Sequence, residues 1–211
     1  MPQRKTVFQT GNIYHIYNRG VEKRTIFTSR KDFLQFLKAI FYYQQTNPGI
    51  KLSLSNYEVE KRKPPFNFEI LTYTLMPNHF HLLLKQIVHD GIIISLQQLL
   101  TSYSKYFNIK HKRVGPLFQG RFKSVAIESD EQLIHTARYI FLNPYTSGLV
   151  DNIAGYEWSA YFEYFKDVNL KMCNQKILLD CLKSKKYFME FINDYADYAR
   201  SLSMIKNQLS D

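Results

Sequence analysis

The chain has 211 residues, enough for one domain with an extension, and 28 Lys and Arg against 18 Asp and Glu give a formal net charge of +10. A hydrophobic fraction of 45% excludes a disordered polyelectrolyte, and no apolar run approaches the roughly 20 residues that span a bilayer. There is no apolar secretory signal, and Cys173 and Cys181 form no C-x-x-C motif, so we expect a cytoplasmic protein without a disulfide framework or a cysteine zinc site.

The first half of the chain predicts three strands and one long helix. Residues 12–18 are rich in Tyr and Ile and end at an Arg-Gly turn, as a strand does. Ser29 is a suitable N-cap for a helix to about residue 45, which an Asn-Pro-Gly sequence ends. Residues 68–75 and 79–85 are strand-like and are separated by a Met-Pro-Asn sequence, which predicts a hairpin.

The second half predicts further helices around a fourth strand. Ser95 is expected to start a helix, residues 121–128 to form a strand, and Ser129 to start another helix. The order strand, helix, strand, strand, helix, strand is that of the ferredoxin-like βαββαβ fold, an antiparallel sheet with helices on one face. We therefore predict an α+β domain over residues 1–165 and a helical C-terminal extension over residues 166–211.

The excess positive charge is concentrated in two segments. Residues 1–31 carry seven basic residues against one acid, and residues 91–127 carry six basic residues and no acid. Residues 128–211 have a net charge of −3. Solubilising surfaces normally mix both signs, so these segments favour a polyanionic partner. The 16 Tyr and 16 Phe offer rings on which unpaired bases could stack.

His79 and His81 are separated by one residue inside a predicted strand. Alternate side chains of a strand point to the same face, so the two imidazoles share one face while Phe80, Leu82 and Leu84 point to a core. Two neutral imidazoles can hold a divalent metal together with an oxygen ligand and water. The alternative is a pair of partly exposed histidines that bind nothing.

Tyr139 and Asn143 lie one helical turn apart on the third predicted helix and therefore share one of its faces. A tyrosine oxygen is a nucleophile once it loses its proton, and an amide oxygen suits a hard metal ion such as Mg²⁺ or Mn²⁺. The alternative for Tyr139 is packing, the usual role of a tyrosine on a helix. His135, one turn earlier, is expected to be a helix-surface residue, and the alternative is a contact with DNA or with the nucleophile.

These residues lie in sequence motifs that resemble those of a known protein family. MPNHFHLLL resembles the histidine–hydrophobe–histidine signature of the HUH single-strand nucleases. YHIYNRG, GPLFQGRFKS and ARYIFLNPYTSGLV resemble further motifs of the single-tyrosine transposases, in particular the REP-associated tyrosine transposases, which are relatives of insertion-sequence transposases. The resemblance covers roughly residues 8–165, and the tail after residue 165 is poorly matched.

The resemblance implies a DNA transposase that cleaves and rejoins strands. His79 and His81 would hold Mg²⁺ or Mn²⁺, with Asn143 as the third protein ligand. Many insertion-sequence relatives have Gln at the position of Asn143. Tyr139 would attack a phosphodiester of single-stranded or hairpin DNA, giving a 5′-phosphotyrosine and a free 3′-hydroxyl that can later reverse the attack.

Two kinds of side chain are candidates for contacts with the DNA. The candidates for phosphate binding are Arg19, Lys110, Lys112, Arg113, Arg121 and Lys123. The candidates for base stacking are Tyr14, Tyr17, Tyr103, Tyr106 and Phe118, of which at least half are expected in the core. His15 either lines the site or is a hydrogen-bonded residue of the sheet.

Two other functions stay open on the sequence alone. A non-catalytic protein that binds single-stranded nucleic acid would explain the basic segments, though not the histidine pair together with Tyr139 and Asn143. A replication initiator or relaxase of the wider HUH class usually has further domains, for which little sequence remains here. In the transposase case we expect a bacterial, nucleoid-associated protein, and both a homodimer and a monomer are compatible with the sequence.

Overall fold

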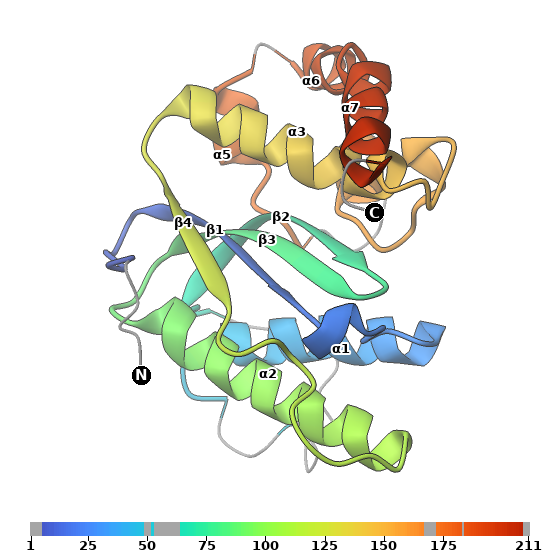
Figure 1. Cartoon of the computed structure of the whole chain (residues 1–211). Helices are drawn as coiled ribbons and strands as arrows, with labels where there is room; N and C mark the ends of the chain where they lie inside the picture. Colours follow the sequence, from blue (N-terminus) through green and yellow to red (C-terminus); the bar gives the residue numbers. More distant parts are fainter. Residues whose placement is uncertain (1–5, 49–51, 53–63, 167–171, 183, 209–211) are drawn as a thin grey trace. The chain divides into compact units, whose positions relative to one another are not determined.

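The computed structural model describes residues 6–48, 52, 64–166, 172–182 and 184–208 (Figure 1). Its elements, in chain order, are β1 (Ile13–Arg19), η1 (Val21–Lys23), α1 (Arg30–Gln44), β2 (Phe68–Met76), β3 (His79–Gln86), α2 (Gly91–Lys110), β4 (Lys123–Ile127), α3 (Asp130–Thr146), η4 (Ile153–Gly155), α4 (Tyr161–Phe165), α5 (Lys176–Asp180), α6 (Lys185–Asn193) and α7 (Ala196–Gln208). Among the described helices, none is both long and apolar enough to cross a bilayer.

The four strands form one sheet in the order β2-β3-β1-β4, which is the strand order of the ferredoxin-like fold. β1 and β3 occupy its centre and pair antiparallel, with Ile13 opposite Lys85 and Arg19 opposite His79. Residues 77 and 78 form the turn between β2 and β3, so the predicted hairpin is confirmed. The predicted α+β fold with an antiparallel sheet is likewise confirmed.

The chain divides into two compact units, which are described separately. The first comprises Met1–Glu69 and Leu75–Ala126, and the second Ile70–Thr74 and Ile127–Asp211. The middle of β2 therefore belongs to the second unit and its ends to the first. The predicted domain boundary between residues 165 and 166 stays a prediction.

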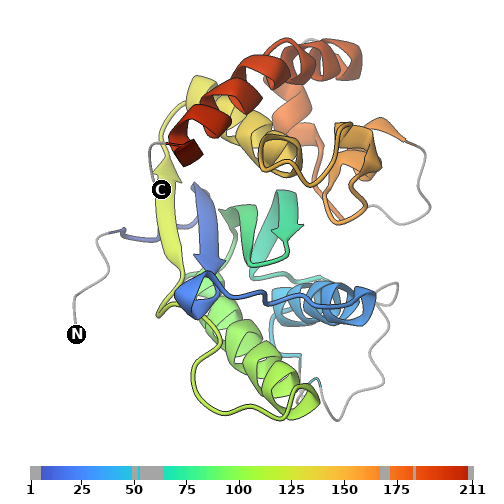
Figure 2. The same ribbon diagram turned by 45° about the vertical axis from the view of Figure 1, so that its right-hand side comes forward.

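In the first unit, α1 and α2 lie side by side on one face of the sheet (Figure 1 and Figure 2). The side chains that β1 and β3 direct to that face are fully buried, as alternation along a strand requires. Ile16 and Leu82 are among them, and the Phe80 ring lies 5.1 Å from that of Phe36 in α1. This core fixes the opposite face of β1 and β3 as the face that carries the histidines.

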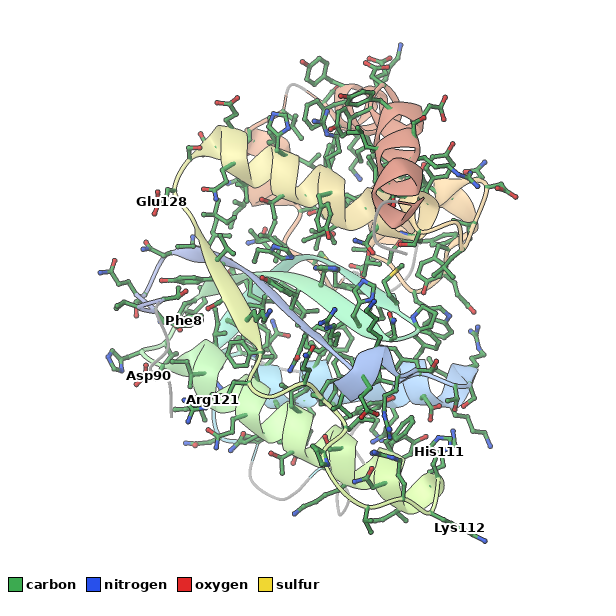
Figure 3. The ribbon with its side chains drawn as sticks, in the orientation of Figure 1. Phe8, Asp90, His111, Lys112, Arg121 and Glu128 are labelled. Atoms are coloured by element: carbon green, nitrogen blue, oxygen red, sulfur yellow. The ribbon has the colours of Figure 1, made fainter. Side chains whose placement is uncertain are left out.

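The start of α2 differs from the prediction. The helix begins at Gly91 rather than at Ser95, and Asp90 precedes it in a left-handed conformation with φ of 54° (Figure 3). Ser95 is buried inside the helix, where its Oγ accepts a hydrogen bond from Nδ2 of Asn67 at 2.9 Å. The Asn67 carbonyl oxygen lies 2.5 Å from the place where a Cβ of residue 91 would stand. The start of α2 is therefore set by the close approach of Gly91 to the Asn67 carbonyl, which a residue with a Cβ could not make, and not by Ser95.

In the second unit, α3 packs with α6 and α7 around an aromatic cluster. The rings of Phe141, Tyr164 and Phe188 contact one another at centroid distances of 5.4–5.8 Å. Tyr164 donates a hydrogen bond from Oη to the Leu71 carbonyl at 2.6 Å, and Thr74 donates one to the Ile140 carbonyl at 2.8 Å. These contacts tie the middle of β2 to α3 and α4.

Candidate active site

β1 and β3 present a row of ring side chains on the sheet face opposite α1 and α2. In the antiparallel register Tyr17 lies opposite His81 and Arg19 lies opposite His79. The alternation that buries Leu82 towards the helices turns His79 and His81 to this face, as predicted from their spacing. The His79 and His81 rings are 5.1 Å apart between centroids and nearly perpendicular, at 88°.

His15 of β1 reaches the same group of rings. Its Nε2 atom lies 2.9 Å from Nδ1 of His81, and the two rings stack at a centroid distance of 5.1 Å. Tyr17 flanks both histidines, with its ring 5.1 Å from that of His15 and 5.8 Å from that of His81. His15 is therefore a hydrogen-bonded residue of the sheet, and its partner is one of the two histidines of the motif.

His79 is held in place by Asn78, a residue of the hairpin turn. Oδ1 of Asn78 lies 2.6 Å from Nδ1 of His79, and Nδ2 of Asn78 donates a hydrogen bond to the Lys23 carbonyl at 3.2 Å. An amide oxygen only accepts, so His79 carries its proton on Nδ1. The lone pair of the neutral ring then lies on Nε2, which is the atom that can ligate a metal.

Burial favours the neutral forms of His81 and His15. It lowers the pKa of His81 well below the usual range, and the neighbouring His15 and His79 lower it further. Burial also lowers the pKa of His15 to about 4. Because a histidine must be neutral to ligate a metal, His81 requires no deprotonation at neutral pH before metal binding.

The donor set of this sheet face fits a divalent metal in part. His79 and His81 supply two imidazoles on one face, and the contacts of their Nδ1 atoms are of the kind that orient metal ligands in proteins. Among the described residues, no group of three or more His, Cys, Asp and Glu side chains could hold a metal ion. A complete site would therefore need a ligand of another type, such as the predicted amide oxygen of Asn143, or water.

Tyr139 and Asn143 lie one turn apart on α3, in the second unit. The helix is capped by Ser129, whose Oγ accepts a hydrogen bond from the Gln132 N–H at 3.1 Å, so the predicted helix start is confirmed. Tyr139 is 51% exposed, whereas Asn143 is only 5% exposed. Tyr139 thus lies on the exposed side of α3, together with His135, while Asn143 lies on its buried side. The histidine pair belongs to the other unit, so joint action of the two pairs is part of the proposal below.

His135 packs on the surface of α3, as predicted. Its Nδ1 atom lies 2.8 Å from a guanidinium nitrogen of Arg138, and its ring lies 5.4 Å from that of Phe191. The Arg138 guanidinium in turn stacks over Phe191 and Tyr195, at 4.1 and 4.2 Å from the ring centroids. These residues attach α6 and the start of α7 to α3.

The predicted phosphate-binding residues fall into two groups. Arg19, Lys112, Arg121 and Lys123 are exposed, and Figure 3 shows Lys112 beyond the end of α2. Lys110 and Arg113 are held by the protein itself. Nζ of Lys110 lies 2.6 Å from Oδ1 of Asp32, and the Arg113 guanidinium donates to Oδ1 of Asn108 at 2.6 Å. Arg19 also has an internal partner, the Oε1 atom of Gln119.

The predicted stacking residues divide between core and surface. Tyr14, Tyr103 and Phe118 are 0%, 1% and 7% exposed, which confirms that at least half of the five belong to the core. Tyr17 and Tyr106 are partly exposed, and Tyr106 donates a hydrogen bond to Asp32 at 3.1 Å. Tyr17, beside the histidines, is the remaining candidate for contact with a substrate.

A pocket of about 600 Å³ lies between α2 and the segment before β4, and sequence reasoning missed it. Arg121 contributes to its wall, next to Phe122. The other lining residues are Ile93, Gln97, Leu100, Thr101 and Gly120. The wall of the pocket is partly apolar and partly polar, and the cation is Arg121. No local sequence pattern indicates this pocket.

Comparison with known proteins finds one kind of likeness. No family model matches the sequence, and no curated protein matches it. Among solved structures, the chain resembles a REP-associated tyrosine transposase bound to a REP hairpin, with a TM-score of 0.56 and 16% sequence identity. The match covers 77% of this chain and 84% of that chain. At this identity the likeness shows a shared fold.

Proposed function

We propose that the chain is a DNA transposase that cleaves and rejoins single-stranded or hairpin DNA through a 5′-phosphotyrosine on Tyr139. The observation that carries the proposal is the oriented histidine pair, whose Nδ1 atoms contact His15 and Asn78. The fold shared with a transposase bound to a REP hairpin supports the same function. The exposed Tyr139, one turn before Asn143, supplies the nucleophile that such a reaction requires.

The cleavage step is a transesterification. Oη of Tyr139 forms a bond to the phosphorus while the bond between phosphorus and the 3′ oxygen breaks. The phenol gives up its proton and the 3′ oxygen takes one up, so no further reactant is needed. In the rejoining step a 3′-hydroxyl attacks the phosphotyrosine, which restores both the phosphodiester and the phenol. Tyr139 therefore conserves the energy of the phosphodiester bond between the two steps.

His79, His81 and Asn143 are the residues that would hold the divalent metal, Mg²⁺ or Mn²⁺. A bound divalent ion withdraws negative charge from phosphate oxygens and helps to orient the substrate. His81 remains neutral at neutral pH, because burial lowers its pKa well below the usual range. The contacts of the two imidazoles with His15 and Asn78 hold the rings in place.

The exposed cations Arg19, Lys112, Arg121 and Lys123 are the residues proposed to bind DNA phosphates. Arg19 lies opposite His79 in the sheet, so a phosphate held there would be close to the histidine pair. Tyr17, beside His81, offers a ring on which an unpaired base can stack.

The test uses the full chain, Mg²⁺ or Mn²⁺, and a hairpin oligonucleotide with single-stranded flanks, labelled at its 3′ end. A 5′-phosphotyrosine keeps the downstream fragment on the protein, so the label is expected to migrate with the protein on a denaturing gel. Tyr139→Phe is expected to abolish this adduct, because phenylalanine has no oxygen to attack the phosphorus. His79→Ala is expected to reduce it strongly.

Matched controls separate chemistry from folding. Tyr198→Phe changes another tyrosine of the second unit, 59% exposed, and is expected to keep the adduct. His89→Ala changes a histidine whose side chain is 86% exposed and is also expected to keep it. An adduct that survives Tyr139→Phe would place the nucleophile elsewhere. Salt-sensitive binding without any adduct on hairpin substrates would favour the non-catalytic binding function.

A further inference from the structure

We propose that His15 is a positioning residue for His81: it accepts the Nδ1 proton of His81 and thereby fixes the nitrogen with which His81 ligates a metal. The inference deepens the proposed function and rests on it for the presence of a metal. The observation behind it is the distance of 2.9 Å between Nε2 of His15 and Nδ1 of His81.

The contact determines the tautomer of His81. A hydrogen bond between two neutral imidazoles needs the proton on one of the two facing nitrogens. When His81 donates from Nδ1, its lone pair lies on Nε2, and His15 carries its own proton on Nδ1. When His15 donates instead, the lone pair of His81 is used within the contact, and Nε2 carries a proton. Only the first arrangement lets His81 act as a metal ligand through Nε2.

The second histidine of the motif has an equivalent contact. His79 donates its Nδ1 proton to Oδ1 of Asn78, at 2.6 Å, and its lone pair therefore lies on Nε2. Both rings thus present the same nitrogen when His81 donates to His15. Metal-binding histidines in proteins usually have such a partner on the other ring nitrogen, which fixes the tautomer and the ring orientation.

The sheet holds His15 in place for this role. β1 is a central strand, and its neighbours Tyr14 and Ile16 are fully buried on the opposite face. The His15 ring stacks on that of His81 with an interplanar angle of 28° and lies 5.1 Å from that of Tyr17. These contacts restrict rotation of the His15 ring, so the acceptor nitrogen stays directed at His81.

The first measurement reads the tautomer directly, without metal, DNA or activity. In the full chain labelled with ¹⁵N-histidine, the two-bond ¹H–¹⁵N spectrum distinguishes a ring protonated at Nδ1 from one protonated at Nε2. We expect His81 to carry its proton on Nδ1 in the unmodified chain. We expect His15→Ala to shift the His81 pattern towards the Nε2-protonated form. A His81 ring protonated on Nε2 in the unmodified chain would overturn the inference.

The second measurement is the affinity for Mn²⁺ alone, followed by electron paramagnetic resonance of the free ion. Loss of a residue that orients a metal ligand typically weakens metal binding about 10–100-fold, and we expect this loss for His15→Ala. His15→Gln is expected to recover most of the affinity, because its Oε1 atom can accept the same proton. His89→Ala is the control that should leave the affinity unchanged. An unchanged Mn²⁺ affinity in His15→Ala would also overturn the inference.

The two proposals fail in different ways. A chain with the expected tautomer and Mn²⁺ affinities, yet without a DNA adduct, would keep the role of His15 and reject the transposase function. If instead the unmodified chain forms the Tyr139 adduct, and His15→Ala keeps the His81 tautomer and the Mn²⁺ affinity of the unmodified chain, the transposase function stands and the role of His15 is rejected. His15→Gln keeps a polar side chain of similar length, so the test stands even where His15→Ala folds poorly.

Discussion

The ammonium nitrogen of Lys110 lies 2.6 Å from Oδ1 of Asp32, a carboxylate whose side chain has no exposed surface. The other carboxylate oxygen, Oδ2, accepts hydrogen bonds from the Thr28 and Ser29 backbone N–H groups at 2.9 and 3.1 Å. Tyr106 donates a further hydrogen bond to Oδ1 at 3.1 Å. The carboxylate thus joins the start of α1 to the end of α2, and its buried charge is fully hydrogen bonded.

Asp32→Ala is expected to lower the free energy of unfolding by about 2–4 kcal/mol. The substitution removes a buried carboxylate with several donors and leaves those donors to water. The Lys110 side chain is 31% exposed, so water can solvate its ammonium group once Asp32 is removed. The loss of unfolding free energy is therefore smaller than that expected when a fully buried charge loses its partner. Urea unfolding followed by circular dichroism measures it. Glu190→Ala breaks the exposed pair with Lys186 at 3.9 Å and should cost less than about 0.5 kcal/mol. Equal losses in both variants would contradict the prediction.

The same carboxylate predicts a loss of stability in acid. Burial raises the pKa of Asp32, but hydrogen bonds from Lys110, Thr28 and Tyr106 outweigh it and hold the pKa well below its usual range. A group whose pKa is lower in the folded state stabilises the protein above its unfolded pKa, about 4, and loses that contribution as the pH falls below it. The difference in unfolding free energy between the unmodified chain and Asp32→Ala should therefore shrink from pH 7 to pH 3. A difference that stays constant with pH would show that Asp32 does not titrate as inferred.

Lys112 and Lys110 are expected to have separate roles although only one residue lies between them. Lys112 is exposed beyond α2, so Lys112→Ala should weaken DNA binding and reduce the slope of log affinity against log salt by about 0.7–0.9. The free energy of unfolding of the Lys112→Ala variant should equal that of the unmodified chain. Lys110→Ala should lower the unfolding free energy, because Lys110 pairs with Asp32. Fluorescence anisotropy with a labelled oligonucleotide at several salt concentrations measures the slope.

The control for the DNA prediction is Lys186→Ala. Lys186 lies on α6 with its side chain 83% exposed, so it is exposed like Lys112 but lies in a segment of acidic net charge. It should leave the salt slope unchanged. If Lys186→Ala reduced the slope as much as Lys112→Ala, binding would depend on net charge alone, and no particular phosphate contact could be assigned to the end of α2.

Local sequence patterns predicted most of the fold. Ser29 and Ser129 precede α1 and α3 as expected, because N-cap preferences act within one helical turn. Strand alternation likewise placed His79 and His81 on one face. The start of α2 at Ser95 is the wrong prediction, because the position is decided by contact with Asn67, which lies just before β2 and 24 residues before Gly91.

The candidate site was predictable only in part, for the same physical reason. His15 and His81 are 66 residues apart, and Lys110 and Asp32 are 78 residues apart. No spacing rule connects such pairs. In the register of β1 against β3, His15 lies opposite Leu83 and is therefore a diagonal neighbour of His81 on the same face. This register becomes known only when the pairing of the strands is known. The sequence alone likewise does not distinguish Lys110, which pairs with a buried carboxylate, from Lys112, which is exposed.

Gly91→Ala is expected to destabilise the protein by about 1–3 kcal/mol, although alanine is the better helix former. A Cβ at residue 91 would stand 2.5 Å from the Asn67 carbonyl oxygen and 3.1 Å from its Cβ, so the start of α2 must move away from the residues before β2. Gly155→Ala is the matched control, because a Cβ there has no neighbouring atom within 4 Å, and it should change stability by less than about 0.5 kcal/mol. Urea unfolding of both variants compares them. If Gly91→Ala were as stable as the unmodified chain, helix propensity and not the approach to Asn67 would determine where α2 begins.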